Sequence, residues 1–170
     1  MKCYKAAGFL SSAGEVLSGL RIYIDEIPQD GLRLEGEIDA ETLDISDDFV
    51  RCGNPLHYRL DISIVSGELL VFGELSVDLM MRCSRCAVMF PSTVSEKAYS
   101  YNQQVEKRLE YADLTEDIRE AIILAFSSYP VCSESCKGLC PQCGANLNEG
   151  ECGCRPPADA RWDGLGGLSL

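Results

Sequence analysis

Residues 56–81, LHYRLDISIVSGELLVFGELSVDLMM, decide the fold of this chain. Apolar side chains occupy every second position through most of this stretch, with polar side chains mainly between them. Such alternation buries one face of a strand and leaves the other in water, which is typical of an antiparallel sheet. Ser66-Gly67 separates two alternating runs and predicts a hairpin turn. Gly73 interrupts the second run and predicts a β-bulge.

The same period of two extends outward from this stretch, from Leu20 to about Tyr101. Asp30-Gly31 lies between two further alternating runs and predicts another hairpin turn. The acidic segment 41–54 has little pattern, so we expect a loop or a short helix there. The first hundred residues therefore predict an antiparallel sheet.

One strong helix is predicted after the strands, because apolar residues recur at helical spacing from Leu114 to Ala125. Asp113 and Glu116, three positions apart, predict a capping box at its start, and Pro130 predicts its end. We expect the apolar stripe of this helix to cover the open face of the sheet. A weaker helix is expected within residues 102–109.

The character of the sequence changes after Pro130, where glycine and cysteine dominate and the periodicity disappears. Such a segment cannot bury a core and becomes ordered only when something cross-links it. The sequence therefore predicts three parts: a sheet-plus-helix domain over residues 1–130, a zinc-binding module over 131–155 and a flexible tail over 156–170.

The chain has ten cysteines, and eight of them come in close pairs or near-pairs. Without a secretion signal, this spacing favours metal ligation over a disulfide framework. Cys140-Pro141-Gln142-Cys143-Gly144 is the strongest motif, since two thiolates two residues apart can hold one ion from a tight turn. The glycine permits a positive φ there. With Cys152 and Cys154, this pair predicts a four-thiolate structural zinc site.

A second four-thiolate site is possible, from Cys83, Cys86, Cys132 and Cys136. Two alternatives remain open at this point. Cys83 and Cys86 could form a redox pair, or Cys136 could serve the first site in place of Cys152 or Cys154. Cys3 and Cys52 have no partner at ligand spacing and are expected to be small buried apolar residues.

The net charge of the chain limits the classes of partner that it can bind. It has 27 acidic residues against 15 basic ones, which give a formal net charge of -12. Such a chain repels naked nucleic acid as a whole. The sequence contains no stretch of 18 apolar residues, so we expect no transmembrane helix. The apolar run over residues 6–10 is too short for a signal peptide. We expect a cytoplasmic protein without membrane contact.

His57, the one histidine, lies on the polar side of a strand, and no catalytic constellation is evident, so we expect no enzyme.

The order of these motifs resembles the YceD-like family, the bacterial large-ribosomal-RNA-subunit accumulation proteins. The resemblance covers roughly residues 56–162. It rests on Cys83-Ser84-Arg85-Cys86 after a strand, the helix over 120–125, Pro130, the string from Cys136 to Asn148, and Cys152-Gly153-Cys154. Family members often end in a basic tail, whereas this chain ends uncharged and rich in glycine after Trp162.

The patterns in the sequence predict a fold, and the resemblance implies a function. From the patterns we expect an α+β protein with an antiparallel β-sheet packed by one main helix and a C-terminal cysteine-rich zinc module. The implied function is that of a non-enzymatic accessory factor in large ribosomal subunit biogenesis, which supports accumulation of large-subunit ribosomal RNA. Its partner would be a large-subunit precursor or an assembly factor. The alternative is a thiol-based redox or metal sensor that uses Cys83 and Cys86. Direct contact with RNA would use the cations near the cysteines, which are Arg82, Arg85, Lys137, Arg155 and Arg161.

Overall fold

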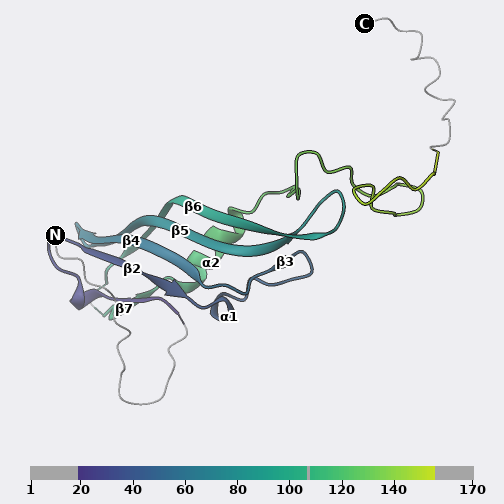
Figure 1. Ribbon diagram of the computed structural model, residues 1–170. Helices are drawn as coiled ribbons and strands as arrows, with labels where there is room; N and C mark the ends of the chain where they lie inside the picture. Colours follow the sequence, from purple (N-terminus) through teal and green to yellow (C-terminus); the bar gives the residue numbers. More distant parts are fainter. Residues whose placement is uncertain (1–18, 107, 156–170) are drawn as a thin grey trace, which may run out of the picture.

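The computed structural model describes residues 19–106 and 108–155. An antiparallel sheet of five strands forms its main layer (Figure 1). Pairing runs from β2 through β4 to the long β5, whose other edge pairs with β6, while the short β3 pairs with the end of β5. The bounds are β2 (Leu32–Ile38), β3 (Val50–Arg51), β4 (Leu56–Val65), β5 (Glu68–Arg82) and β6 (Met89–Gln104).

Both local predictions within the opening stretch are confirmed. Ser66 and Gly67 form the two-residue turn between β4 and β5, with φ values of 52° and 84°, and positive φ at both positions is what a type I′ hairpin turn requires. The register of β5 against β6 shifts between Gly73 and Leu75, which marks a bulge. A β-carbon at Gly73 would collide with the carbonyl oxygen of Arg59, so only glycine fits this position.

The predicted alternation also describes the core. In β5, Leu69, Val71, Leu75, Val77, Leu79 and Met81 are all buried. The opposite face of the sheet carries cross-strand ion pairs, including Arg33 with Asp61 and Arg59 with Glu35. One face therefore forms the core and the other meets solvent.

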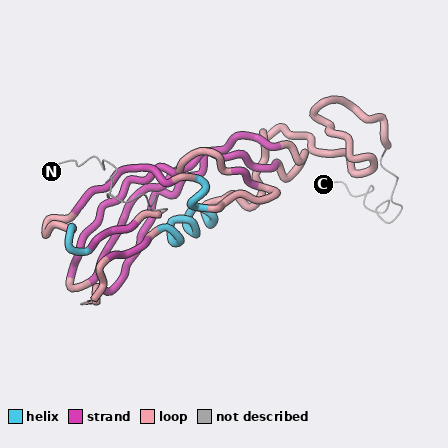
Figure 2. Tube along the Cα trace, turned by 90° about the horizontal axis from the view of Figure 1, so that it is seen from below, coloured by secondary structure: helices cyan, strands magenta, loops and turns pink. Residues whose placement is uncertain are grey.

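The helix α2 (Thr115–Leu124) covers the buried face of the sheet, where it contacts β5 and β6. Figure 2 shows it on one side of the strands. Leu114, Ile118 and Ile122 are fully buried, and each such side chain contributes about 1.5–3 kcal/mol by leaving water. The described residues are thus mainly antiparallel sheet with one main helix, as the α+β prediction states.

The predicted capping box at the start of α2 is wrong. Asp113 accepts the backbone N–H of Thr115 at 3.0 Å and its hydroxyl at 2.6 Å, whereas Glu116 pairs with Arg119 on the helix surface. Asp113 belongs to the short strand β7 (Tyr111–Asp113), which pairs with β1 (Arg21–Tyr23). The N-cap position is therefore Leu114, which makes no side-chain bond, and the Asp113 carboxylate binds the first helical residue from the end of a strand.

Two other local predictions are also wrong. Residues 28–31 make a turn in which the Gly31 N–H donates to the Pro28 carbonyl, but the turn follows the 3-10 helix η1 (Ile24–Glu26) and joins no hairpin. The weak helix expected within residues 102–109 is absent among the described residues there, because β6 runs on to Gln104 and pairs with β5. Cross-strand pairing overrides the weak helical pattern.

The acidic segment 41–54 is partly as predicted. It contains the end of the short helix α1 (Ala40–Leu43), and it also contains β3, which the sequence pattern did not predict. Beyond Ala125, the described residues are loop and turn apart from an isolated bridge between Leu139 and Asn146. This C-terminal segment extends past the end of the sheet (Figure 1).

No helix among residues 19–106 and 108–155 is long and apolar enough to cross a membrane. The predicted tail 156–170 and Cys3 lie outside the described residues. The predicted division at residues 130 and 155 stays a prediction.

Candidate metal centres

The structure gathers eight cysteines into two groups of four, and within each group all four Sγ atoms lie within 4.8 Å of one another. The hairpin cluster consists of Cys83, Cys86, Cys132 and Cys136. The ribbon cluster consists of Cys140, Cys143, Cys152 and Cys154. These are the two sets that the sequence spacing suggested, and Cys136 lies with the hairpin cluster rather than with the ribbon cluster.

The hairpin cluster joins two distant parts of the chain. Cys83 and Cys86 lie in the turn between β5 and β6, whereas Cys132 and Cys136 follow α2. The Sγ atoms of Cys83 and Cys136 are 3.9 Å apart, and those of Cys86 and Cys132 are 3.7 Å apart. Three of the four side chains are buried, with only Cys132 exposed.

A tight turn presents Cys83 and Cys86 on the same side. The N–H of Cys83 donates to the Val88 carbonyl at 2.9 Å, and the N–H of Ala87 donates to the Cys83 carbonyl at 2.9 Å. The backbone of Ala87 is left-handed, with φ of 59°. The backbone N–H of Arg85 points at the Sγ of Cys83 from within the turn, at 3.4 Å.

The ribbon cluster repeats this turn with different residues. The N–H of Cys140 donates to the Ala145 carbonyl at 2.8 Å, and the N–H of Gly144 donates to the Cys140 carbonyl at 2.9 Å. Gly144 has φ of 74°, which is the positive φ predicted for the glycine after Cys143. Ala87 and Gly144 therefore occupy equivalent positions in two turns of the same construction.

The hairpin turn packs directly against the segment that brings Cys132 and Cys136. The N–H of Ser84 donates to the Pro130 carbonyl at 2.8 Å. The Nη1 of Arg85 donates to the carbonyls of Glu134 and Cys136, both at 3.1 Å. These bonds hold the end of the β5–β6 hairpin and the chain after α2 together independently of any ion.

Asn148 connects the two clusters. Its Nδ2 donates to the Sγ of Cys136 at 3.5 Å, and its Oδ1 accepts the N–H of Lys137 at 2.8 Å. The backbone nearby is also paired, since the Leu139 N–H donates to the Arg85 carbonyl and the Leu147 N–H donates to the Gly138 carbonyl. The ribbon cluster is therefore attached to the hairpin cluster by hydrogen bonds rather than by a free linker.

The thiols within each cluster have divergent pKa values. Burial opposes ionisation of Cys83, but the backbone N–H groups of Cys86, Cys132 and Arg85 outweigh it and lower its pKa to about 6. Backbone N–H groups of Cys143 and Gln142 lower the pKa of Cys140 to about 6 as well.

The pKa values of two neighbouring thiols are shifted in the opposite direction. Cys136 raises the pKa of Cys132 to about 12, and Cys143 raises that of Cys154 to about 12. Four close thiols cannot all ionise in water because their charges repel, whereas a divalent cation among them removes that obstacle.

The donor sets fit zinc. Each cluster offers four sulfur atoms, which is the ligand set of closed structural zinc sites. A tetrahedral ion with bonds of about 2.3 Å to sulfur separates its ligands by about 3.8 Å, and the two sulfur pairs of the hairpin cluster lie at 3.9 and 3.7 Å. None of the nine described cysteines forms a disulfide.

The cations proposed for RNA contact have different surroundings. The guanidinium of Arg82 lies 5.5 Å from the ring centre of Phe49, and that of Arg85 is bonded to two carbonyls. Lys137 and Arg155 are exposed. Arg161 lies outside the described residues. Arg85 therefore has a structural role that its sequence context did not reveal.

The remaining candidates lie away from the clusters. Cys52 is half-buried rather than fully buried, and its Sγ lies 3.5 Å from the Asn54 carbonyl. His57 is exposed on the solvent face of the sheet, 3.3 Å from Glu37, as its place in the alternation predicted. The sequence analysis did not predict the role of Asn148, since its only signal in the sequence is its place at the end of the string from Cys136 to Asn148.

The comparison with protein families matches the C-terminal part of the chain. A family described as "Large ribosomal RNA subunit accumulation protein YceD" matches residues 99–169. The match includes Cys132, Cys136 and the ribbon cluster, whereas Cys83 and Cys86 precede it.

Several curated proteins are similar to the chain. One, from Arabidopsis thaliana, is a chloroplastic "Large ribosomal RNA subunit accumulation protein YCED homolog 1", 39% identical over 57 residues, which are 33% of this chain and 18% of that protein. Its Zea mays namesake is 47% identical over 45 residues, 26% of this chain and 15% of that protein. An uncharacterized Mycobacterium tuberculosis protein is 27% identical over 124 residues, 65% of this chain and 60% of that protein. The chain thus spans less than two thirds of each of these relatives. No solved structure matches it significantly.

Proposed function

We propose that this chain, a member of the YceD-like family, is a non-enzymatic accessory factor in large ribosomal subunit biogenesis, built around two structural zinc ions. The observation that carries the proposal is the pair of four-cysteine clusters at one end of the molecule, within a chain whose C-terminal part matches a family described by large-subunit ribosomal RNA accumulation. Members described in those words include the chloroplastic relatives.

Zinc would act here as a structural cross-link. The hairpin cluster would tie the β5–β6 hairpin to the chain after α2, and the ribbon cluster would order the last described residues. Thiolate ligands in sets of four leave no open position for substrate or water, which is the property of structural sites. The Asn148 amide and the surrounding backbone N–H groups would stabilise the sulfur charge.

A scaffold is favoured over a thiol-based sensor by the burial of the proposed redox pair. Cys83 is 2% exposed and Cys86 is 4% exposed, and reactive sensor thiols are accessible to solvent. Both thiols also belong to a four-sulfur set that suits an ion. The sensor alternative expects one bound zinc ion and a reactive pair, whereas the scaffold expects two ions and inert thiols.

The proposed site of action is the cytoplasm, and the proposed partner is a large-subunit precursor or another assembly factor. Direct RNA contact would be confined to the zinc end, where Lys137 and Arg155 are exposed, because the net charge of -12 repels phosphate elsewhere.

Depletion of the protein in cells that encode it tests this function. The ratio of large-subunit to small-subunit ribosomal RNA should fall, and the wild-type chain should restore it. A Cys136→Ser variant should restore it poorly, while Cys52→Ser, a change at a cysteine outside both clusters, should restore it fully. An unchanged ratio on depletion would sink the proposal. Elemental analysis of the purified wild-type chain should find about two zinc ions per chain.

A further inference from the structure

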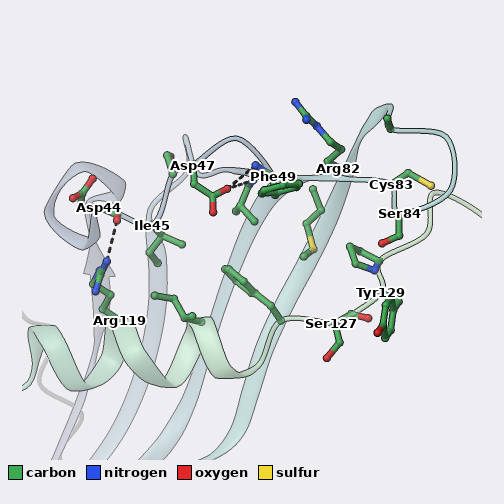
Figure 3. A pocket seen from close by; sticks show the side chains of 18 residues that line it. Asp44, Ile45, Asp47, Phe49, Arg82, Cys83, Ser84, Arg119, Ser127 and Tyr129 are labelled. Carbon is green, nitrogen blue, oxygen red and sulfur yellow. Dashed lines mark hydrogen bonds between the residues drawn. The ribbon is translucent and has the colours of Figure 1, made fainter. Parts of the chain in front are cut away.

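An open groove of about 1020 Å³ lies beside the hairpin cluster, at the end of the sheet. Figure 3 shows it between the C-terminal part of α2 and the segment that joins α1 to β3. Cys83 and Ser84 line one end of it, and Asp44 and Arg119 line the other. Apart from Cys83, the residues that line it belong to neither cysteine cluster.

The groove has an apolar floor and aromatic side chains at its margin. Ile45, Met81 and Phe126 contribute to the floor. Phe49 is 62% exposed and Tyr129 is 81% exposed, although large aromatic side chains gain most from burial. Exposed aromatics around a concave apolar surface are typical of a site for a protein partner.

The charge beside the groove is negative. The ten residues 39–48 carry five carboxylates and no lysine or arginine, and Asp44 and Asp47 from this segment line the groove. Arg119 lines it too, but its guanidinium is paired with Glu116 at 2.9 Å. The rim therefore favours a cationic occupant.

Arg82 is the feature that would favour a nucleic acid instead. Its Nε is buried and has no hydrogen-bond partner among the described residues. The side chain points away from the floor of the groove, however, with the Phe49 ring beneath it (Figure 3). A phosphate chain in the groove would pass the carboxylates of residues 39–48, which repel it.

We propose that this groove binds a cationic segment of a partner protein, whose apolar or aromatic side chains enter between Phe49 and Tyr129 while its lysines or arginines face the carboxylates of residues 39–48. The inference rests on the proposed function only in expecting the segment to come from a ribosomal protein or another assembly factor.

A peptide-binding experiment tests the groove directly. The probe is a fluorescein-labelled peptide of about 12 residues in which lysine alternates with phenylalanine and leucine. Fluorescence anisotropy of the zinc-loaded full chain should show binding that weakens with salt. A peptide with glutamate in place of lysine should not bind. Hydrogen exchange of the wild-type chain should slow in segments 44–50 and 123–130 when the lysine peptide is added.

Matched variants separate the groove from general attraction to an acidic protein. The double variants Phe49→Ser/Tyr129→Ser and Asp44→Asn/Asp48→Asn should each weaken binding about fivefold to tenfold. Two controls should stay within about twofold of the wild type. They are Phe72→Ser, at an aromatic side chain 53% exposed on the solvent face, and Asp30→Asn/Glu68→Gln. Glu68 lies at the opposite end of β5 from Arg82, roughly 45 Å away along an extended strand.

Three results would overturn the inference: equal losses in the control variants, exchange protection outside the two named segments, or tighter binding of a single-stranded RNA of similar length that depends on Phe49 and Tyr129. The last would assign the groove to RNA. None of these results bears on the ratio of ribosomal RNAs after depletion, so the groove and the proposed function fail separately.

Discussion

Ala87 carries a backbone conformation that suits glycine better. Its φ of 59° matches the 74° of Gly144 at the equivalent position of the ribbon turn. The left-handed conformation costs a residue with a β-carbon about 1–2 kcal/mol, while glycine gives back about 0.5–1 kcal/mol in chain entropy. Ala87→Gly should therefore raise the free energy of unfolding of the zinc-loaded protein by about 0.5–1 kcal/mol, as measured by denaturant titration.

Two further substitutions control this prediction. Gly144→Ala should lower stability by about 1 kcal/mol through backbone strain alone, because a β-carbon there would meet no atom within 4 Å. Ala98→Gly, at an exposed position in β6, should lower it by about 0.5–1 kcal/mol. A loss of stability in Ala87→Gly like that in Ala98→Gly would contradict the argument.

Arg85 is predicted to support the hairpin cluster rather than to contact RNA. Its Nη1 holds the carbonyls of Glu134 and Cys136, so Arg85→Gln should loosen the chain that carries two of the ligands. We expect zinc release to a chromogenic chelator to become about tenfold faster, the effect typical of supporting residues around a metal. Arg108→Gln, at an exposed arginine between β6 and β7 that belongs to neither cluster, should release zinc as the wild type does. Normal zinc release with impaired ribosomal RNA accumulation would return Arg85 to the role of an RNA contact.

Cysteine grouping could be predicted from the sequence, because a two-residue spacing fixes a turn that presents both thiols to one point. The supporting roles of Arg85 and Asn148 could not. Each role depends on a contact between residues that are distant in the sequence. Arg85 and Glu134 are 49 positions apart, and Asn148 and Cys136 are 12 positions apart. Hydrogen bonds across such separations leave no periodic trace in a single sequence.

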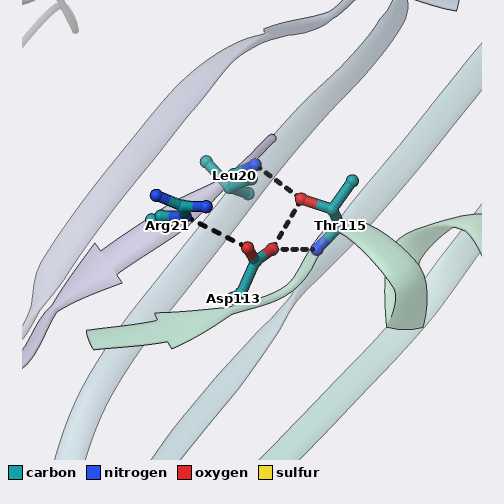
Figure 4. A network of polar contacts seen from close by, with 4 residues as sticks. All are labelled: Leu20, Arg21, Asp113 and Thr115. Atoms are coloured by element: carbon teal, nitrogen blue, oxygen red, sulfur yellow. Dashed lines mark hydrogen bonds and ion pairs between the residues drawn. The ribbon is translucent and has the colours of Figure 1, made fainter. Parts of the chain in front are cut away.

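Three elements meet at Asp113, which lies at the end of β7 and just before α2 (Figure 4). Its carboxylate accepts bonds from Thr115 and pairs with Arg21 of β1 at 3.2 Å. The Thr115 hydroxyl in turn accepts the N–H of Leu20 at 2.9 Å. Partial burial opposes ionisation of Asp113, but the bonds from Thr115 and Arg21 hold its pKa below the ordinary value.

This network predicts a pH-dependent contribution to stability. Because the pKa of Asp113 is lower in the folded chain, its contribution is complete above the ordinary aspartate pKa of about 4 and is lost as the pH falls through the folded value. Asp113→Asn should cost about 0.5–1 kcal/mol near neutral pH, because the amide can still accept from Thr115 but loses the ion pair with Arg21 and the negative charge near the start of α2. The difference from the wild type should shrink in denaturant titrations near pH 3. Asp61→Asn should cost less at neutral pH, since its pair with Arg33 is exposed. A difference in Asp113→Asn that does not change with pH would contradict the assignment.

Long elements could be predicted better than short ones. The alternation in β4 and β5 and the helical spacing in α2 extend over ten residues or more, so burial dictates their type. The strands β1, β3 and β7 have two or three residues each and exist because a partner strand pairs with them. The expected helix within residues 102–109 failed for the same reason, since β5 pairs with that segment as far as Gln104.

The whole molecule combines an apolar core in the sheet domain with a C-terminal segment that has little core of its own. The buried apolar residues form one cluster around the sheet, α1 and α2. A separate small cluster contains Cys83, Cys86 and Cys136 with Phe90 and Val131 against them. Stability should therefore be uneven, because the sheet is held by apolar burial and the C-terminal segment by its cross-links.

Loss of each metal site should consequently remove hydrogen-exchange protection from a different set of residues. Cys143→Ser should raise hydrogen exchange mainly in residues 140–155, because the hairpin cluster and the bonds from Arg85 still hold the preceding segment. Cys136→Ser should raise it from Val131 onward, and it should also expose the β5–β6 turn that shares the site. The sheet and α2 should stay protected in both variants, since Leu114, Ile118 and Ile122 remain packed against the strands.

Cys52→Ser, outside both clusters, should change exchange only near its own position. Equal effects of Cys143→Ser and Cys136→Ser would show that the two sites order as one unit through Asn148. Loss of protection across β4 and β5 in Cys136→Ser would show instead that the apolar core depends on the metal. That result would contradict the view that apolar burial alone holds the sheet while the cross-links hold the C-terminal segment.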